Sequence, residues 1–265
     1  MRHDLLKNTD NTIPAGRLGE QLATARPRFN RPTRVAAHSR RGRGRLEEDV
    51  MQEGRAGGGR SGSLDRPRQK IIMSYDMKKQ SVLRTPTLST LLDCAEAMAR
   101  GWTPDTLRGR GAAIARMTRI SADPEKYLAE MTGNPPGDGV IELPDGSVVP
   151  RLPGWTRWIW SNSFAGQIAF RWRPGTTDLP PTCLGHIGYA VVPWRRGEGL
   201  ATRALFETLQ DVRKLDLPRV EITCETNNDA SRRVIEKCGG VLIEQFTAPA
   251  ALGGKKLLRF QIPLT

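Results

Sequence analysis

A glycine- and arginine-rich turn joins an apolar strand pattern to an amphipathic helix pattern. Glycine lets the backbone approach a ligand closely, and unpaired N–H groups at the start of a helix, aided by the helix dipole, bind phosphate oxygens. The turn is therefore predicted to bind an anion. Its residues are Arg196, Gly197, Glu198, Gly199, Leu200 and Ala201.

The spacing of these residues narrows the class of anion site. A P-loop requires Gly-Lys followed by Ser or Thr, which the turn lacks. The dinucleotide fingerprint Gly-x-Gly-x-x-Gly/Ala would place a small residue where Thr202 stands. The turn therefore matches neither the P-loop nor the dinucleotide-binding motif. The turn alone leaves open a purely structural role for its two glycines.

A second segment, residues 225–240, adds a signature downstream. Asn228 and Ser231 precede the sequence Val-Ile-Glu-Lys-Cys at 234–238, which is followed by two glycines. Together with Arg196-x-x-Gly199-x-Ala201, this segment resembles the two signatures of the GNAT (Gcn5-related N-acetyltransferase) family, in the same order. The resemblance covers about residues 80–265, and the sequence Gly-His-Ile-Gly-Tyr at 185–189 resembles a bacterial branch of predicted acetyltransferases.

The resemblance implies that acetyl-CoA is a cosubstrate and assigns roles to matched residues. Backbone N–H groups of residues 196–201 would hold the pyrophosphate of acetyl-CoA. The backbone of Val191 would pair with the pantetheine arm and help to polarise the thioester carbonyl. Asn228 and Ser231 would lie beside the pantetheine and the thiol. For both residues, capping of the helix that follows is the alternative, because asparagine is a favoured N-cap residue.

Acetyl transfer to an amine also requires a base. A lysine-like amine with a pKa near 10.4 loses its proton at a cost of about 4.6 kcal/mol at pH 7. The two candidate bases are His186 and Glu225. Strand alternation places His186 on the face opposite Ile187, Tyr189 and Val191, and a packing role is the alternative. Glu225 ends the next strand, and its alternative is a solvated strand end.

One position departs from the family pattern. Many GNAT enzymes carry a tyrosine in the last signature helix that protonates the departing thiolate, and this chain has Ile235 there. Water or another group then serves as the acid, or the thiolate leaves unaided, since a thiol pKa is about 8.5. The same residue raises the alternative of a GNAT fold that binds acyl-CoA as a sensor without turnover.

The periodicity of apolar residues predicts an α/β domain over residues 79–265. The order of helices and strands favours one mixed sheet with helices around it. The resemblance implies the GNAT fold, in which this central sheet is mostly antiparallel. A turn-rich segment at 133–139 separates the early helices from the strands. The expected strands are 81–84, 155–160, 166–172, 185–192, 219–224, 241–246 and 257–262, and the expected helices are 88–101, 104–132 with one break, 198–214 and 229–237.

Residues 1–78 are predicted to be a disordered basic tail. Within 1–70 there are 16 Lys/Arg against 8 Asp/Glu, and Phe29 is the only aromatic residue. Such a segment buries too little apolar surface to offset chain entropy. Phosphate contacts by this tail make nucleic-acid binding the second hypothesis, although without aromatic residues it lacks stacking platforms.

The remaining composition argues against a zinc protein, a disulfide-rich protein, a membrane-spanning protein and a secreted protein. The four cysteines show neither zinc-site spacings nor the density of a disulfide scaffold, so no metal is expected. No apolar run reaches the length of a membrane span, and the N-terminus lacks the apolar stretch of a signal peptide, which favours a cytoplasmic protein. The expected acceptor is a primary amine of a small molecule, a peptide N-terminus or a lysine. The sequence identifies neither the acceptor nor the oligomeric state.

Overall fold

The computed structural model describes residues 80–105, 109–132, 139–143 and 145–264. The predicted tail at 1–78, with the nucleic-acid contact assigned to it, lies outside the described residues. So does most of the turn predicted at 133–139. Within the described ranges, no helix is both long enough and apolar enough to cross a membrane.

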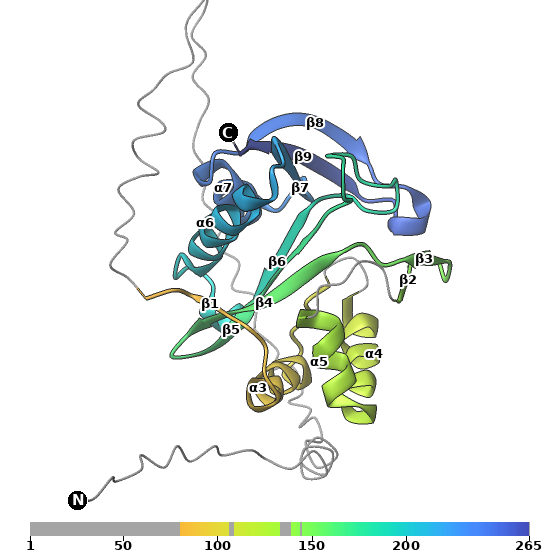
Figure 1. The fold of residues 1–265 in the computed structure, drawn as a ribbon, viewed down its shortest axis with the longest axis vertical. Helices are drawn as coiled ribbons and strands as arrows, with labels where there is room; N and C mark the ends of the chain where they lie inside the picture. Colours follow the sequence, from red (N-terminus) through yellow and green to blue (C-terminus); the bar gives the residue numbers. More distant parts are fainter. Residues whose placement is uncertain (1–79, 106–108, 133–138, 144, 265) are drawn as a thin grey trace, which may run out of the picture. The chain divides into compact units, whose positions relative to one another are not determined.

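Two antiparallel sheets carry the fold (Figure 1). In the first sheet the strand order is β1-β4-β5-β6, and in the second it is β7-β9-β8. A separate antiparallel hairpin is formed by β2 and β3. The strands are β1 (Leu83–Arg84), β2 (Val140–Glu142), β3 (Val148–Pro150), β4 (Gly154–Ser161), β5 (Ser163–Arg171), β6 (Ile187–Val191), β7 (Arg219–Glu225), β8 (Val241–Thr247) and β9 (Lys256–Pro263).

Helices pack on both faces of the first sheet (Figure 1). Alternate strand residues point to opposite faces, so Ile159 contacts the core under α6 whereas Trp158 contacts the core formed with α3, α4 and α5. The helices are α3 (Leu88–Ala99), α4 (Gly109–Ala122), α5 (Pro124–Thr132), α6 (Leu200–Val212) and α7 (Asp229–Lys237), with short 3₁₀ turns η1 (Pro193–Arg195), η2 (Arg213–Leu215) and η3 (Ala250–Leu252).

The two sheets meet at one short joint between β6 and β7. The His186 N–H donates to the Glu221 carbonyl at 2.8 Å, and the Glu221 N–H donates to Nδ1 of the His186 ring at 3.0 Å. Beyond this joint no strand pairing connects β6 to β7 in the described part of the chain. The structure confirms the predicted α/β architecture of mostly antiparallel strands and flanking helices. The expected central sheet is divided in two because β6 and β7 separate after His186.

The hairpin of β2 and β3 was not predicted. Each of its strands has three residues, and their side chains are exposed or half-buried. Ile141 and Val149 pack against a small buried cluster, but strands of three residues are too short to show the alternation that predicts longer strands.

Candidate functional site

The predicted anion-binding turn lies between β6 and α6 and leaves the start of α6 open. Gly199 is the N-cap of α6 and has a φ of 74°, and no side chain caps the helix. Gly197 also has a positive φ, 85°. Glycine adopts this backbone conformation without strain. The first-turn N–H groups of α6 therefore have no side-chain acceptor and are available to an anion.

Arg195, the last residue of η1, and Arg196, the first residue of the turn, have different partners. Arg195 donates to both carboxylate oxygens of Glu198, at 2.7 and 2.8 Å, and to Ser163 Oγ at 3.0 Å. The hydrogen bonds from Arg195 hold the pKa of the Glu198 carboxyl below its usual value. Arg196 is exposed, and its Nε donates to the Val191 carbonyl at 3.3 Å. Among the described residues Arg196 forms no ion pair, so it supplies a free positive charge at the turn.

The edge of β6 that faces away from β5 offers free backbone groups. Hydrogen bonds join Val192 to Ala165 and Arg171 to His186, both at 2.9 Å. In an antiparallel pair hydrogen-bonded and non-hydrogen-bonded residues alternate, so Tyr189 and Val191 are non-hydrogen-bonded positions. Their N–H and C=O groups point away from β5, toward the side of the separating β7. This edge is suited to pairing with an extended amide chain such as pantetheine.

The second signature lies at the end of β7 and the start of α7. Asn228 is the N-cap of α7, and its Oδ1 accepts a hydrogen bond from the Ser231 N–H at 3.0 Å. The predicted capping alternative for Asn228 is thus the geometry observed. Glu225, which ends β7, accepts a hydrogen bond from Lys255 Nζ at 2.6 Å and is half-buried.

Sequence reasoning gave no role to Tyr189, which links the two signatures. Its hydroxyl lies 2.8 Å from Ser231 Oγ, so it connects β6 to the first turn of α7. Burial raises the pKa of the Tyr189 phenol, which therefore stays protonated at neutral pH. Ile235 is fully buried in the core one turn further along α7. No sequence signal pointed to Tyr189, because it lies 42 residues from Ser231.

His186 lies in the joint between the sheets and is 1% exposed. Its Nδ1 accepts the hydrogen bond from Glu221, so in the neutral ring the proton is on Nε2 and no lone pair remains for a substrate. Burial lowers the pKa of His186, and Glu221 opposes this only in part. The predicted strand parity holds, since Ile187, Tyr189 and Val191 share the face under α6. This geometry favours the packing alternative for His186.

The buried ring of His186 leads us to expect a pH-dependent stability. Its pKa in the folded state is below the value of about 6.5 expected when unfolded, so below pH 6.5 the unfolded chain binds a proton that the folded chain does not. The contribution of the neutral His186 ring to the free energy of unfolding is fully present above pH 6.5. It is lost as the pH falls below this value, by up to about 1.4 kcal/mol per pH unit. Urea unfolding across this range should show the slope.

His186→Asn is the matched variant, because its amide oxygen can still accept the Glu221 N–H and it does not titrate. The slope of the unfolding free energy near pH 6 should decrease in this variant. Replacing His3 and His38, which lie outside the described residues, with asparagine should leave it unchanged. An identical slope in the His186 variant and the parent would contradict the assignment.

The two candidate bases lie at different ends of this region. Glu225 is four residues beyond Glu221, about 13 Å along β7 from the joint that holds His186. The structure thus brings Val191, the turn at 196–201, Asn228 and Ser231 around the open edge of β6, with Glu225 just before the α7 cap. His186 lies apart from them. Within the described ranges, no cluster of three His, Cys, Asp or Glu could hold a metal ion, and the four cysteines are free.

The part of the chain that contains β6, α6 and α7 matches a family of known domains. Residues 149–241 match the acetyltransferase (GNAT) domain. This GNAT match runs from β3 to the start of β8 and includes both signatures. It covers about a third of the 265 residues. No curated protein sequence matches the chain.

Solved structures of acetyltransferases are similar to the chain at low sequence identity. One is the microcin C7 self-immunity acetyltransferase MccE with acetyl-CoA and AMP, at 13% identity, 68% of this chain, 91% of that chain and a TM-score of 0.45. RimL, a ribosomal L7/L12 alpha-N-protein acetyltransferase, has 14% identity, coverages of 68% and 92% and a TM-score of 0.43. A GNAT-family acetyltransferase from Bacillus anthracis has 16% identity, coverages of 69% and 93% and a TM-score of 0.44.

Proposed function

We propose that this chain is an acetyl-CoA-dependent N-acetyltransferase that acts on a primary amine by direct attack. The observation that carries the proposal is the uncapped start of α6, with Gly197 and Gly199, directly after the free edge of β6. The GNAT match over 149–241 supports the same function. The assignment to the bacterial branch indicated by residues 185–189 stays a prediction.

The residues present fit acetyl-CoA. First-turn N–H groups of α6 suit a pyrophosphate, as does Arg196, which forms no ion pair with a described residue. The pairing of Glu198 with Arg195 offsets the only carboxylate of the turn. The Tyr189 backbone groups and the Val191 N–H, which point away from β5, suit the amides of the pantetheine arm. When bound, acetyl-CoA supplies an acetyl group activated as a thioester.

The chain's own contribution is then positioning and proton transfer. The Val191 N–H, on the free edge of β6, would donate to the thioester carbonyl as negative charge develops there. Glu225 is our candidate for the base that removes the proton from the attacking amine, directly or through a water molecule. A C–N bond forms, the C–S bond breaks, and the thiolate takes a proton from solvent or from the hydroxyl of Ser231, which Tyr189 keeps hydrogen-bonded.

Binding and turnover by the full chain test the proposal. Acetyl-CoA should bind in the low micromolar range and raise the melting temperature, because it binds only the folded state. Free thiol should then be released in the presence of a primary amine and not in its absence, as followed with a thiol-reactive dye. The amines should include small molecules, peptide N-termini and lysine side chains.

Two negative results of these experiments would lead to different conclusions about the function. Tight binding without amine-dependent thiol release from any of the three amine classes would favour the acyl-CoA sensor, for which the buried Ile235 is the supporting observation. No binding of acetyl-CoA would overturn the proposal itself. Mass spectrometry of the acetylated product would identify the nitrogen that is modified.

A further inference from the structure

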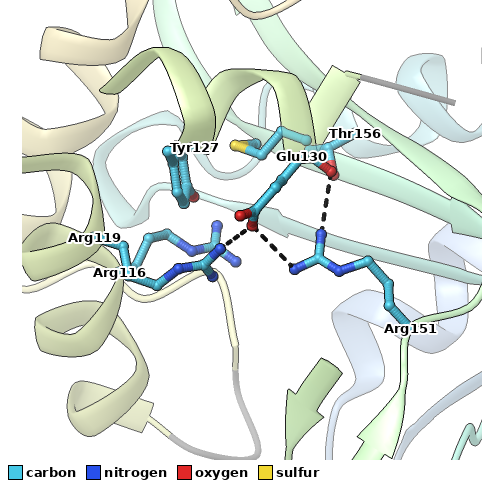
Figure 2. A pocket seen from close by; sticks show the side chains of 7 residues that line it. Arg116, Arg119, Tyr127, Glu130, Arg151 and Thr156 are labelled. Carbon is cyan, nitrogen blue, oxygen red and sulfur yellow. Dashed lines mark hydrogen bonds and ion pairs between the residues drawn. The ribbon is translucent and has the colours of Figure 1, made fainter. Parts of the chain in front are cut away.

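A cavity lined by three arginines lies on the face of the first sheet covered by α4 and α5 (Figure 2). Its volume is about 80 Å³, which is room for one small group rather than a nucleotide, since a water molecule takes about 30 Å³ in the liquid. The lining residues come from α4, α5, the segment before β4 and β4 itself, and none belongs to the predicted acetyl-CoA site. They are Arg116, Arg119, Tyr127, Glu130, Met131, Arg151 and Thr156.

The charges around the cavity do not balance. Glu130 is its only carboxylate and forms ion pairs with Arg119 and, at 3.7 Å, with Arg151 (Figure 2). Arg116 donates to the neutral Gln167 Oε1 at 2.7 Å and forms no ion pair with a described residue. Three guanidinium groups thus face one carboxylate. The excess of positive charge favours an anionic ligand.

Two buried polar groups at the cavity have no hydrogen-bond partner in the described part of the chain. They are the Tyr127 hydroxyl and Arg151 Nε. Tyr127 is 4% exposed, and burial raises its pKa to about 12, so the hydroxyl carries its proton. A guanidinium nitrogen donates and does not accept. Unpaired buried donors cost about 1–3 kcal/mol each, and a ligand with acceptor oxygens would satisfy them.

A hydrogen bond between Arg116 and Gln167 connects the cavity to β5, the strand next to β6. Gln167, which accepts from Arg116, lies on β5 directly opposite Ala190, the residue before Val191 on β6. Gln167 is itself buried. The side chains of α3, α4 and α5 cover this face of the sheet, whereas α6 and the phosphate-binding turn belong to the other. The cavity therefore lies on the face of the first sheet opposite α6.

We propose that this cavity binds the carboxylate or phosphate group of the acceptor, so that the acceptor is a small primary amine with an oxyanion elsewhere in the molecule. The evidence for an anion site is the excess of positive charge around the cavity and the two unpaired buried donors, and it does not depend on the proposed acetyltransferase function. Its assignment to the acceptor rests on the proposed acetyltransferase function. Carboxylate and phosphate share the chemistry that the three arginines recognise, and the binding experiment compares them.

Direct anion binding is measured on the full chain with inorganic phosphate and acetate at constant ionic strength. The methionine methyl groups are labelled with ¹³C, and the Met131 methyl, which lines the cavity, is assigned with a Met131→Leu variant. One of the two anions should shift the Met131 signal with saturation in the millimolar range. The anion that binds more tightly indicates the group that the acceptor carries.

Two variants and a charge-matched control make the result specific. Arg116→Gln should weaken binding about tenfold, and Tyr127→Phe should weaken it several-fold with little change in packing. Lys214→Gln removes an equal charge from a side chain that is 75% exposed on η2 and should leave binding unchanged. If neither anion shifts the Met131 signal, the proposal is overturned. Equal binding by the Arg116 and Lys214 variants would also overturn it, because the bound anion would then be an adventitious ion only.

The acceptor assignment has its own test. Amines that carry a carboxylate or phosphate should be acetylated in preference to neutral amines of the same length. Arg116→Gln should raise the KM of these acceptors about tenfold and leave the Kd of acetyl-CoA unchanged. Equal use of neutral amines would overturn the assignment to the acceptor. Anion binding without any thiol release would leave the cavity as an anion site and count against the acetyltransferase function instead.

Discussion

Gly199→Glu is expected to raise the Kd of acetyl-CoA at least a hundredfold, or about 2.7 kcal/mol. Gly199 has a φ of 74° and caps α6, so a side chain there is strained in the backbone conformation that opens the helix start. The new carboxylate would lie beside the first-turn N–H groups, compete with the pyrophosphate for them and repel it. Calorimetric titration with acetyl-CoA measures the effect.

Gly253→Glu is the matched control for this substitution. Gly253 also has a positive φ, 91°, caps η3 and has open space where a side chain would extend. The variant introduces the same charge and a similar backbone strain outside the turn at 196–201. It should bind acetyl-CoA like the parent, and both variants should show the circular dichroism of a folded chain. If Gly199→Glu binds with parental affinity, the turn is not the acetyl-CoA site.

Glu225→Gln is expected to lower turnover by 10²- to 10⁴-fold, the usual contribution of a general base. Glutamine has the shape of glutamate but does not accept a proton near neutral pH. The Kd of acetyl-CoA should change little, because Glu225 lies at the end of β7 and outside the turn at 196–201. Thiol release under saturating acetyl-CoA and amine gives kcat, and titration gives the Kd.

Lys255→Gln separates the base from its ion pair. The Glu225 carboxylate accepts a hydrogen bond from Lys255 Nζ at 2.6 Å, so both variants remove this ion pair and only Glu225→Gln removes the carboxylate. Equal loss of activity in the two variants would assign the effect to the ion pair. If Glu225→Gln keeps parental turnover, we would conclude that positioning and a bound water suffice for deprotonation.

The parts of the fold that are local in sequence were the ones that could be predicted. The helix expected at 229–237 matches α7, because a capping asparagine and two terminal glycines mark its ends. The helix expected at 198–214 begins two residues later, at Leu200, because Gly199 adopts the left-handed conformation at its start. Capping residues and apolar periodicity are properties of adjacent residues, so a single sequence shows them.

Contacts between distant segments could not be predicted. The parity of His186 on its strand followed from alternation, but its hydrogen bond to Glu221 spans 35 residues and depends on where β6 and β7 meet. The same holds for the arginine-lined cavity, in which Arg116 and Gln167 are 51 residues apart. Isolated arginines on separate elements resemble ordinary surface charges until the fold brings them together.

The anchoring of Arg195 has a consequence for the thermodynamics of ligand association. Its guanidinium binds Glu198 within the turn and the Ser161 carbonyl at 3.0 Å in the neighbouring hairpin, so the turn is fixed to β4 and β5 before a ligand arrives. Ordering a flexible side chain on binding costs about 0.5–1.5 kcal/mol. Because Arg195 is already ordered in the folded protein, its conformational entropy is lost on folding and not on ligand binding. A ligand therefore meets a turn that Arg195 already anchors, and its affinity is not reduced by the cost of ordering this side chain.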